Sequence, residues 1–184
     1  MKDWHEVKTV NDYYADECIS ALQKFIRRNM LKEACFIGYE LYATSEELEE
    51  VMWQRLLIIS IEDIGMSDKM ANTIVQNMYQ TSKIFDYKSP DRPMVFIGAI
   101  RYLCQCEKER SSCHLCSITK RRVRNHDKIE IPDFVYDMHT KRGREMGRGY
   151  DHFLEEGSRV YPHSDIDDTP LMEELKQWIE REKR

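Results

Sequence analysis

Residues 53–68 read WQRLLIISIEDIGMSD, and this stretch decides the fold. Its large apolar side chains recur at intervals of three and four residues, at Trp53, Leu56, Leu57, Ile61 and Ile64. These intervals place them on one face of an α-helix. Ile58 and Ile59 widen the apolar surface, so we expect a central helix with neighbours on several sides. Gly65 is expected to end the helix, because glycine readily takes the left-handed conformation of a helix C-cap.

Two consecutive acidic residues, Glu62 and Asp63, lie in the last turn of this expected helix. The helix dipole disfavours negative charge at that end. We therefore expect the two carboxylates to bind neighbouring backbone groups or arginine side chains. The alternative is a catalytic carboxylate pair, which the spacing disfavours because consecutive residues on a helix do not point toward one atom.

The remainder of the chain is also patterned for helices. Only seven Gly and five Pro occur in 184 residues, which favours long helices over many short strands. Thr44 and Glu47 match the T-x-x-E capping box that opens a helix. We predict an all-α, antiparallel multi-helix bundle around the central helix, with an irregular C-terminal segment. The expected organisation is a flexible N-terminus over 1–10, a helical domain over 11–156, and an acidic linker with a C-terminal helix over 157–184.

The lengths of the apolar runs and the first residues of the chain indicate the expected cellular location. No apolar run approaches the roughly 18 residues that a membrane-spanning helix needs. The first residues, MKDWHEVK, lack the apolar core of a signal peptide. We therefore expect a cytoplasmic protein with no membrane partner. Structural disulfides among its six Cys are not expected in that compartment.

Four separated segments carry a family resemblance. Residues 55–68 follow R-L-L-x-I-x-x-E-D-I-G-x-x-D, residues 21–28 read ALQKFIRR, residues 108–112 form a short linker, and residues 131–139 follow I-P-D-x-x-x-D-x-H. In this order and approximate spacing they resemble the C-terminal helical region of the RarA/MgsA family. That family consists of AAA+ ATPases of replication-associated recombination. The resemblance covers roughly residues 18–150.

The resemblance implies a role in assembly. In the family this region builds the homotetramer, so we expect a homo-oligomer, most simply a tetramer, acting as an accessory module in DNA replication and repair. DNA or a replication protein is the expected further partner. The family's ATPase core precedes this region, whereas almost nothing precedes it here. The chain also contains no G-x-x-x-x-G-K-[ST] phosphate loop, so the ATPase activity does not carry over.

A basic middle between acidic ends favours an alternative function. Residues 101–148 hold twelve Lys and Arg against seven Asp and Glu, although the net charge of the chain is −5. Clustered basic side chains can neutralise phosphates. The predicted nucleic-acid-binding residues are Lys120, Arg121, Arg122, Arg124, Lys141, Arg142, Arg144 and Arg148. A solvated basic face and an acidic protein partner remain alternatives for the same residues.

The cysteines suggest a further alternative, a zinc or redox protein. Cys104, Cys106, Cys113 and Cys116 follow C-x-C-x6-C-x2-C, and four thiolates can bind zinc tetrahedrally. The expected helix places Cys104 and Cys106 on different faces, so we expect unmetallated cysteines and no cofactor. The six His lie apart, with no H-E-x-x-H or Ser-His-Asp arrangement. We predict no catalytic residues and no enzyme activity.

Overall fold

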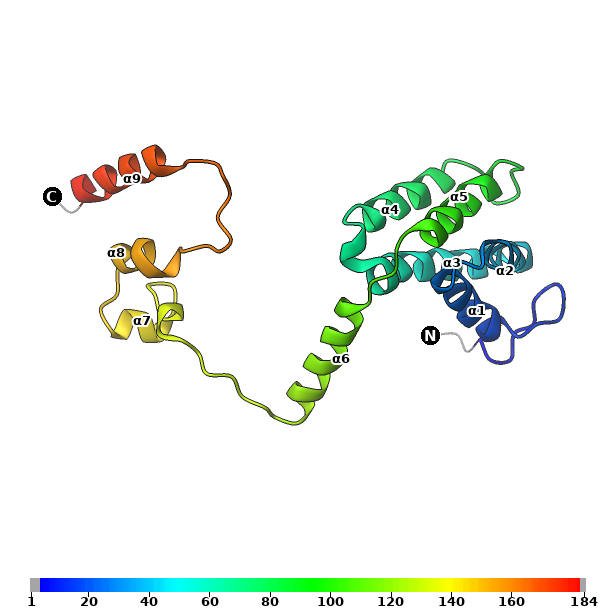
Figure 1. Ribbon diagram of the computed structural model, residues 1–184, viewed down its shortest axis with the longest axis horizontal. Helices are drawn as coiled ribbons and strands as arrows, with labels where there is room; N and C mark the ends of the chain where they lie inside the picture. Colours follow the sequence, from blue (N-terminus) through cyan, green and yellow to red (C-terminus); the bar gives the residue numbers. More distant parts are fainter. Residues whose placement is uncertain (1–3, 183–184) are drawn as a thin grey trace. The chain divides into compact units, whose positions relative to one another are not determined.

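The computed structural model describes residues 4–182, and their regular structure is helical apart from one isolated antiparallel bridge between Lys8 and Tyr14. The all-α prediction is confirmed. The contacts divide the chain into a first unit, Met1–Asp127, and a second unit, Lys128–Arg184 (Figure 1). This division differs from the single helical domain expected over 11–156. Among the described residues, no helix combines the length and the apolar character needed to cross a membrane.

The first unit contains six α-helices and two irregular helical turns among its described residues. The α-helices are α1 (Ala15–Arg27), α2 (Leu31–Thr44), α3 (Glu46–Ile59), α4 (Ala71–Ser82), α5 (Arg92–Gln105) and α6 (Ser111–Arg124). A π-helical turn, η1 (Ser60–Ile64), and a 3-10 turn, η2 (Gly65–Ser67), follow α3 directly. The helices α1, α2, α4 and α5 all contact α3, as its wide apolar surface predicts.

The core of the first unit is built around α3. Leu48, Met52, Trp53, Leu56 and Ile59 of α3 are buried. They form one apolar cluster with side chains of the surrounding helices, including Leu22, Ile26, Leu41, Phe96, Ile100 and Leu103. The central position of this helix is therefore confirmed. Burying such side chains stabilises the fold by roughly 1.5–3 kcal/mol each.

The buried face of the central helix differs in detail from the predicted one. Ile61 is 51% exposed and Leu57 is only partly buried, although both were placed on the inner face. At about 100° per residue, the buried side chains centre on Leu56, and Leu57 and Ile61 fall roughly 100° and 140° away from that centre. After Ile59, the buried side chains are Ser60, Asp63 and Ile64. Gly65 then ends the segment with a positive φ of 55°, but its ψ of −127° lies outside the left-handed helical conformation that was expected.

The start of α3 also differs from its prediction. Ser45, and not Thr44, is the N-cap, and its side chain accepts a hydrogen bond from the backbone N–H of Leu48 at 3.1 Å. The hydroxyl of Thr44 instead donates to the carbonyl of Glu40, because Thr44 is the last residue of α2. The short connection between the two helices leaves only Ser45 with the extended backbone of an N-cap.

The N-terminal segment is packed from residue 4 onward, whereas the sequence analysis expected flexibility over 1–10. Thr9 is buried, and its backbone N–H donates to the Tyr13 carbonyl at 2.9 Å. Ala15 donates to the Val7 carbonyl at 2.8 Å, and Trp4 packs against the core. These bonds to the start of α1 hold the segment in place. Residues 1–3 of the prediction lie outside the described residues.

The second unit combines short turns with one longer helix. Its described elements are η3 (Asp133–Val135), α7 (Lys141–Glu145), α8 (Tyr150–His152), η4 (Phe153–Gly157) and α9 (Thr169–Glu182). The segment before α9 is irregular, as expected, but it is held by specific bonds. None of the described residues of α9 is buried, although its apolar residues Leu171, Leu175 and Trp178 recur at helical spacing.

Candidate functional site

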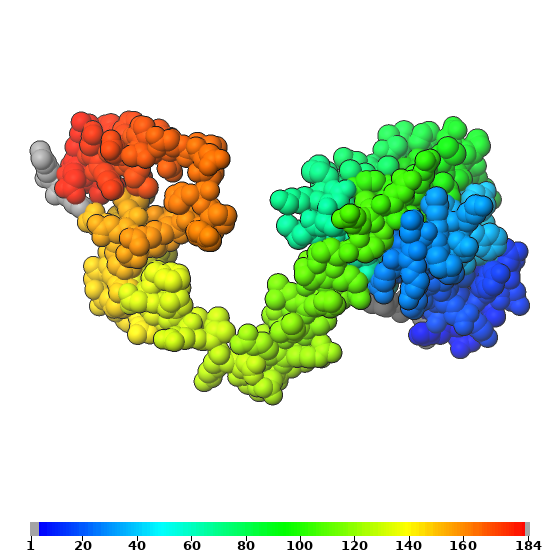
Figure 2. Space-filling view, viewed as in Figure 1, coloured from blue at the N-terminus to red at the C-terminus, as the bar shows by residue number. Residues whose placement is uncertain are grey.

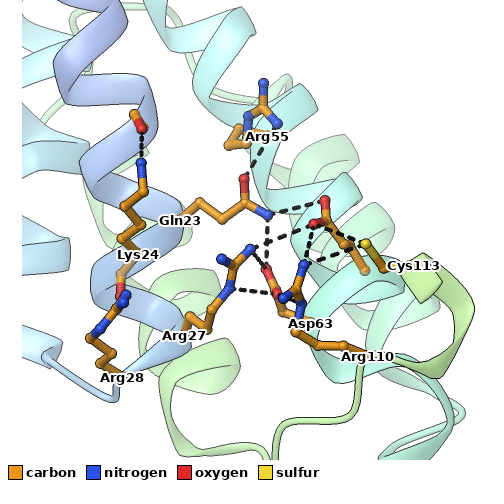
Figure 3. Close-up of polar contacts among 10 residues, drawn as sticks. Gln23, Lys24, Arg27, Arg28, Arg55, Asp63, Arg110 and Cys113 are labelled. Atoms are coloured by element: carbon orange, nitrogen blue, oxygen red, sulfur yellow. Dashed lines mark hydrogen bonds and ion pairs between the residues drawn. The ribbon is translucent and has the colours of Figure 1, made fainter. Parts of the chain in front are cut away.

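A polar site in the first unit is centred on the carboxylate of Asp63, which is fully buried in η1. Arg27 on α1 donates from Nε to Asp63 Oδ1 at 2.7 Å, and Gln23 donates from Nε2 to Oδ2 at 2.8 Å. Arg110, just before α6, places its Nε 3.1 Å from Oδ1 (Figure 3). Two guanidinium groups and one amide therefore replace the water that this carboxylate loses on burial.

Glu62 lies beside Asp63 and shares its partners. Arg110 donates from Nη2 to Glu62 Oε1, and Gln23 donates to Oε2, both at 3.1 Å. Partial burial acts to raise the pKa of Glu62, but the bonds from Gln23 and Arg110 outweigh it and hold the pKa below its usual value. We refer to Gln23, Arg27, Glu62, Asp63 and Arg110 as the Asp63 cluster.

The Asp63 cluster explains three of the four segments that carry the family resemblance. Gln23 and Arg27 belong to segment 21–28, the acidic pair belongs to segment 55–68, and Arg110 belongs to the linker 108–112. The interpretation of the acidic pair as arginine-bound is thus confirmed. Sequence reasoning did not name its three partners, although the shared segments contain all of them.

The same cluster fixes the beginning of α6. Glu109 donates its backbone N–H to the Asp63 carbonyl at 2.8 Å, and its side chain accepts a bond from the backbone N–H of Met66 at 3.2 Å. From this attachment α6 extends away from the rest of the first unit (Figure 2). None of the residues of α6 is buried. The attachment therefore presents a helix that its own unit does not cover.

An apolar groove of about 620 Å³ lies between α1 and α2, and the sequence analysis did not predict it. Its apolar lining residues are Tyr13, Cys18, Ala21, Phe25, Phe36 and Ile37. Glu17, Lys32 and Glu33 supply the charged part of its lining. Phe36 is 55% exposed and Tyr13 is 46% exposed, so large rings of this groove face solvent. The position of Phe36 off the buried face of α2 is the sequence signal that could have revealed the groove.

The eight predicted nucleic-acid-binding residues fall into two groups, one in each unit. Lys120, Arg121, Arg122 and Arg124 all lie on α6 and are all exposed. Arg121 donates to the Ser117 carbonyl one turn earlier at 3.0 Å. Arg122 pairs with Asp127 at 3.3 Å. Such exposed contacts are weak, so these side chains are available to a charged partner.

The group in the second unit is more strongly engaged in its own structure. Arg148 donates to the carbonyls of Asp133 and Tyr136 at 2.9 Å each, and pairs with the Asp133 carboxylate at 2.6 Å. Arg144 donates to two carbonyls of the 138–139 segment at 3.2 Å. Arg142 lies 4.2 Å from the centre of the Tyr136 ring. Two of these arginines therefore hold the turns of the second unit together.

Lys141 completes this second group. Its amine lies 3.7 Å from Glu145, and its side chain is 87% exposed. Thr140 caps this short helix by accepting a bond from the backbone N–H of Gly143 at 3.0 Å. Close approach of the Asp137 carbonyl to Gly143 leaves no room for a Cβ atom there. His139 packs edge-on against Phe153, with ring centres 5.2 Å apart.

The four cysteines of the zinc alternative do not converge on one point. Burial raises the pKa of Cys104 to about 11. The Cys106 thiol lies 3.9 Å from a carboxylate oxygen of Asp68, and Cys113 lies beside the Asp63 cluster, 3.6 Å from Glu62. Cys116 is exposed. Within residues 4–182, no three side chains of the types that bind metals are grouped to hold an ion.

The first unit is thus an all-helical unit with an arginine-bound acidic pair directly after its central helix. The family described as MgsA AAA+ ATPase C terminal matches residues 34–177. The chain belongs to this family. It is also similar to the replication-associated recombination protein A of Bacillus subtilis (strain 168), at 28% identity over 148 residues. The match covers 80% of this chain and 32% of that protein, so the chain spans about a third of its relative.

Proposed function

We propose that this chain is a non-enzymatic, self-associating accessory module of DNA replication and recombination. The observation that carries the proposal is the apolar groove between α1 and α2, where Phe36 and Tyr13 are exposed on a unit otherwise rich in charge. A concave apolar surface with charged residues along it is a common form of interaction site. The relation to a replication-associated recombination protein supports the biological setting.

The contacts of the Asp63 cluster support a structural role for the acidic pair Glu62 and Asp63. Both carboxylates of the motif bind arginines, so they are held in place by fixed positive charges. A catalytic acid or base needs access to a reacting group. The printed sequence also contains no phosphate-loop motif for nucleotide hydrolysis. We therefore assign the cluster to the architecture of the module.

The test is the mass of the purified chain in solution. Light scattering coupled to size-exclusion chromatography should give a particle near four times the 22.1 kDa chain mass at micromolar concentration. A dimer or trimer would retain self-association and revise the tetramer. A 22 kDa particle under these conditions would remove self-association from the proposal.

Nucleic-acid binding is a second candidate function, carried by α6. Between Ser111 and Arg124 this helix has four basic residues, all exposed, and no acidic residue. Such a helix can contact phosphates without reading bases. In this setting DNA or another replication protein is the partner class that we propose. The salt dependence of binding separates this candidate from a purely structural role and is treated as a prediction below.

A further inference from the structure

The helix α6 carries exposed apolar side chains on one side, and its own unit leaves them uncovered. Leu115, Ile118 and Val123 are 65%, 54% and 69% exposed. At about 100° per residue, these three side chains fall within an arc of roughly 140° on one side of the helix, and Thr119 and Arg122 lie within the same arc. Lys120 and Arg121 lie at the two borders of this arc. An amphipathic helix with this pattern is suited to an apolar groove that has acidic edges.

The groove between α1 and α2 has matching dimensions. Its lining begins at Tyr13, just before α1, extends along α1 from Glu17 to Phe25, and takes in Phe36 and Ile37 of α2. At about 1.5 Å per helical residue, the α1 part from Glu17 to Phe25 is roughly 12 Å long. The apolar side of α6 extends about 12 Å from Leu115 to Val123 by the same measure. One helix of this kind therefore fits along the groove.

The charges of the two surfaces are complementary. Glu17 and Glu33 lie along the groove and are exposed, with Lys32 as the one basic lining residue. Among the described residues, no ion pair involves either glutamate. The opposing helix has no acidic residue. Complementary charges of this kind orient and select a partner.

We propose that α6 of one copy docks into the α1–α2 groove of a second copy of this chain. The attachment of Glu109 and Arg110 to η1 holds α6 away from the groove of its own copy, so the helix must come from another molecule. This inference rests on the proposed self-association and names the surfaces that produce it. Because the contact joins two different surfaces, repeated copies form a closed ring when the rotation closes.

The experiment is a charge-reversal complementation with the full chain, without nucleic acid. The groove variant carries Glu17→Lys and Glu33→Lys, and the helix variant carries Lys120→Glu and Arg121→Glu. All four side chains are exposed, so both variants should remain folded by circular dichroism. Each variant alone places like charges across the contact and should weaken association at least about tenfold. Mixing the two variants should restore it, because each mixed contact again joins opposite charges.

Two further variants test the apolar part and provide a control. Phe36→Glu in the groove should also weaken association. Met94→Glu places the same charge at a 71% exposed apolar position of α5 and should leave association unchanged.

The outcomes separate this inference from the proposed function. If the unmodified chain associates and neither charge variant changes its mass, the groove and α6 are not the interface, although self-association stands. If both variants dissociate and their mixture does not recover, the two surfaces do not meet each other. If the unmodified chain is a monomer, both proposals fail.

Discussion

At the scale of single residues, the buried carboxylate of Asp63 depends on two arginines. Its carboxylate is fully buried, and its two arginine partners remain partly exposed, at 25% and 35% of their side-chain surface. Removing one member of a buried ion pair leaves the others without compensation. The partial exposure of Arg27 and Arg110 limits that cost, because water can reach them.

Replacing Asp63→Asn keeps the size of the side chain and removes its charge. We expect a loss of about 2–4 kcal/mol in the free energy of unfolding, somewhat below the cost of breaking a fully buried pair. Urea denaturation measures this loss in the free energy of unfolding. The matched control is Asp127→Asn, which breaks an exposed pair with Arg122 and should cost no more than about 1 kcal/mol. Equal losses in the two variants would contradict the assigned role of Asp63.

The lowered pKa of Glu62 predicts a pH dependence of stability. A carboxyl whose pKa is lowered by folding stabilises the protein above its unfolded pKa of about 4.3. That contribution is lost as the pH falls through the lower folded pKa. Glu62→Gln should therefore destabilise the fold at neutral pH and show a shallower loss of stability below about pH 4.3. Thermal melts between pH 3 and pH 7 measure both effects, and unchanged acid sensitivity would contradict the prediction.

At the scale of elements, helical spacing decides which of the two consecutive leucines of α3 faces the core. Leu56 is fully buried, whereas its neighbour Leu57 is only partly buried. Leu56→Ala should leave a cavity and cost about 2–5 kcal/mol. Leu57→Ala should cost clearly less, because solvent already reaches part of this side chain. Chemical denaturation of the two variants compares them directly, and the reverse order would show that the helix register is wrong.

The second unit depends on one close backbone approach. A Cβ atom at Gly143 would overlap the carbonyl group of Asp137, whereas a Cβ atom at Gly149 would meet nothing within 4 Å. Gly143→Ala must shift the backbone, so we expect a cost of about 1–3 kcal/mol or more. Gly149→Ala should change stability by no more than about 0.5 kcal/mol. Amide hydrogen exchange over residues 131–157 should rise only in the first variant.

At the scale of the whole molecule, a net charge of −5 opposes DNA binding unless the basic residues act together. If α6 contacts phosphates, log affinity should fall linearly with log salt, by about 0.9 per phosphate for duplex and 0.7 for single strands. Arg122→Glu with Arg124→Glu should weaken binding to all sequences alike. Fluorescence anisotropy with labelled DNA measures both effects.

The control for that measurement changes the net charge equally at other exposed positions, as Lys69→Glu with Lys88→Glu. It should retain most of the affinity. No binding at low salt, or equal binding by both double variants, would remove nucleic acid as a partner of α6.

Features that depend on residues close together in the sequence were predicted better than features that depend on tertiary contacts. Helical periodicity located the central helix, and the order of four short segments indicated the family. Both are local properties of the chain. The inner face was wrong at Ile61, because the apolar residues surround most of the helix and their spacing does not show which of them the neighbouring helices cover. The N-cap was assigned one residue early for a similar reason, since only the backbone conformation separates Thr44 from Ser45.

The sequence by itself determined the all-α class, the central helix, and an acidic pair that needs positive partners, because these follow from spacing and charge along the chain. Only the tertiary structure decided that Arg27 and Arg110 are those partners, since residues far apart in sequence meet through helix packing. It also decided that α6 is uncovered and that α1 and α2 enclose a groove. Such surfaces depend on how helices are placed against one another, and the pattern of one helix does not contain that information.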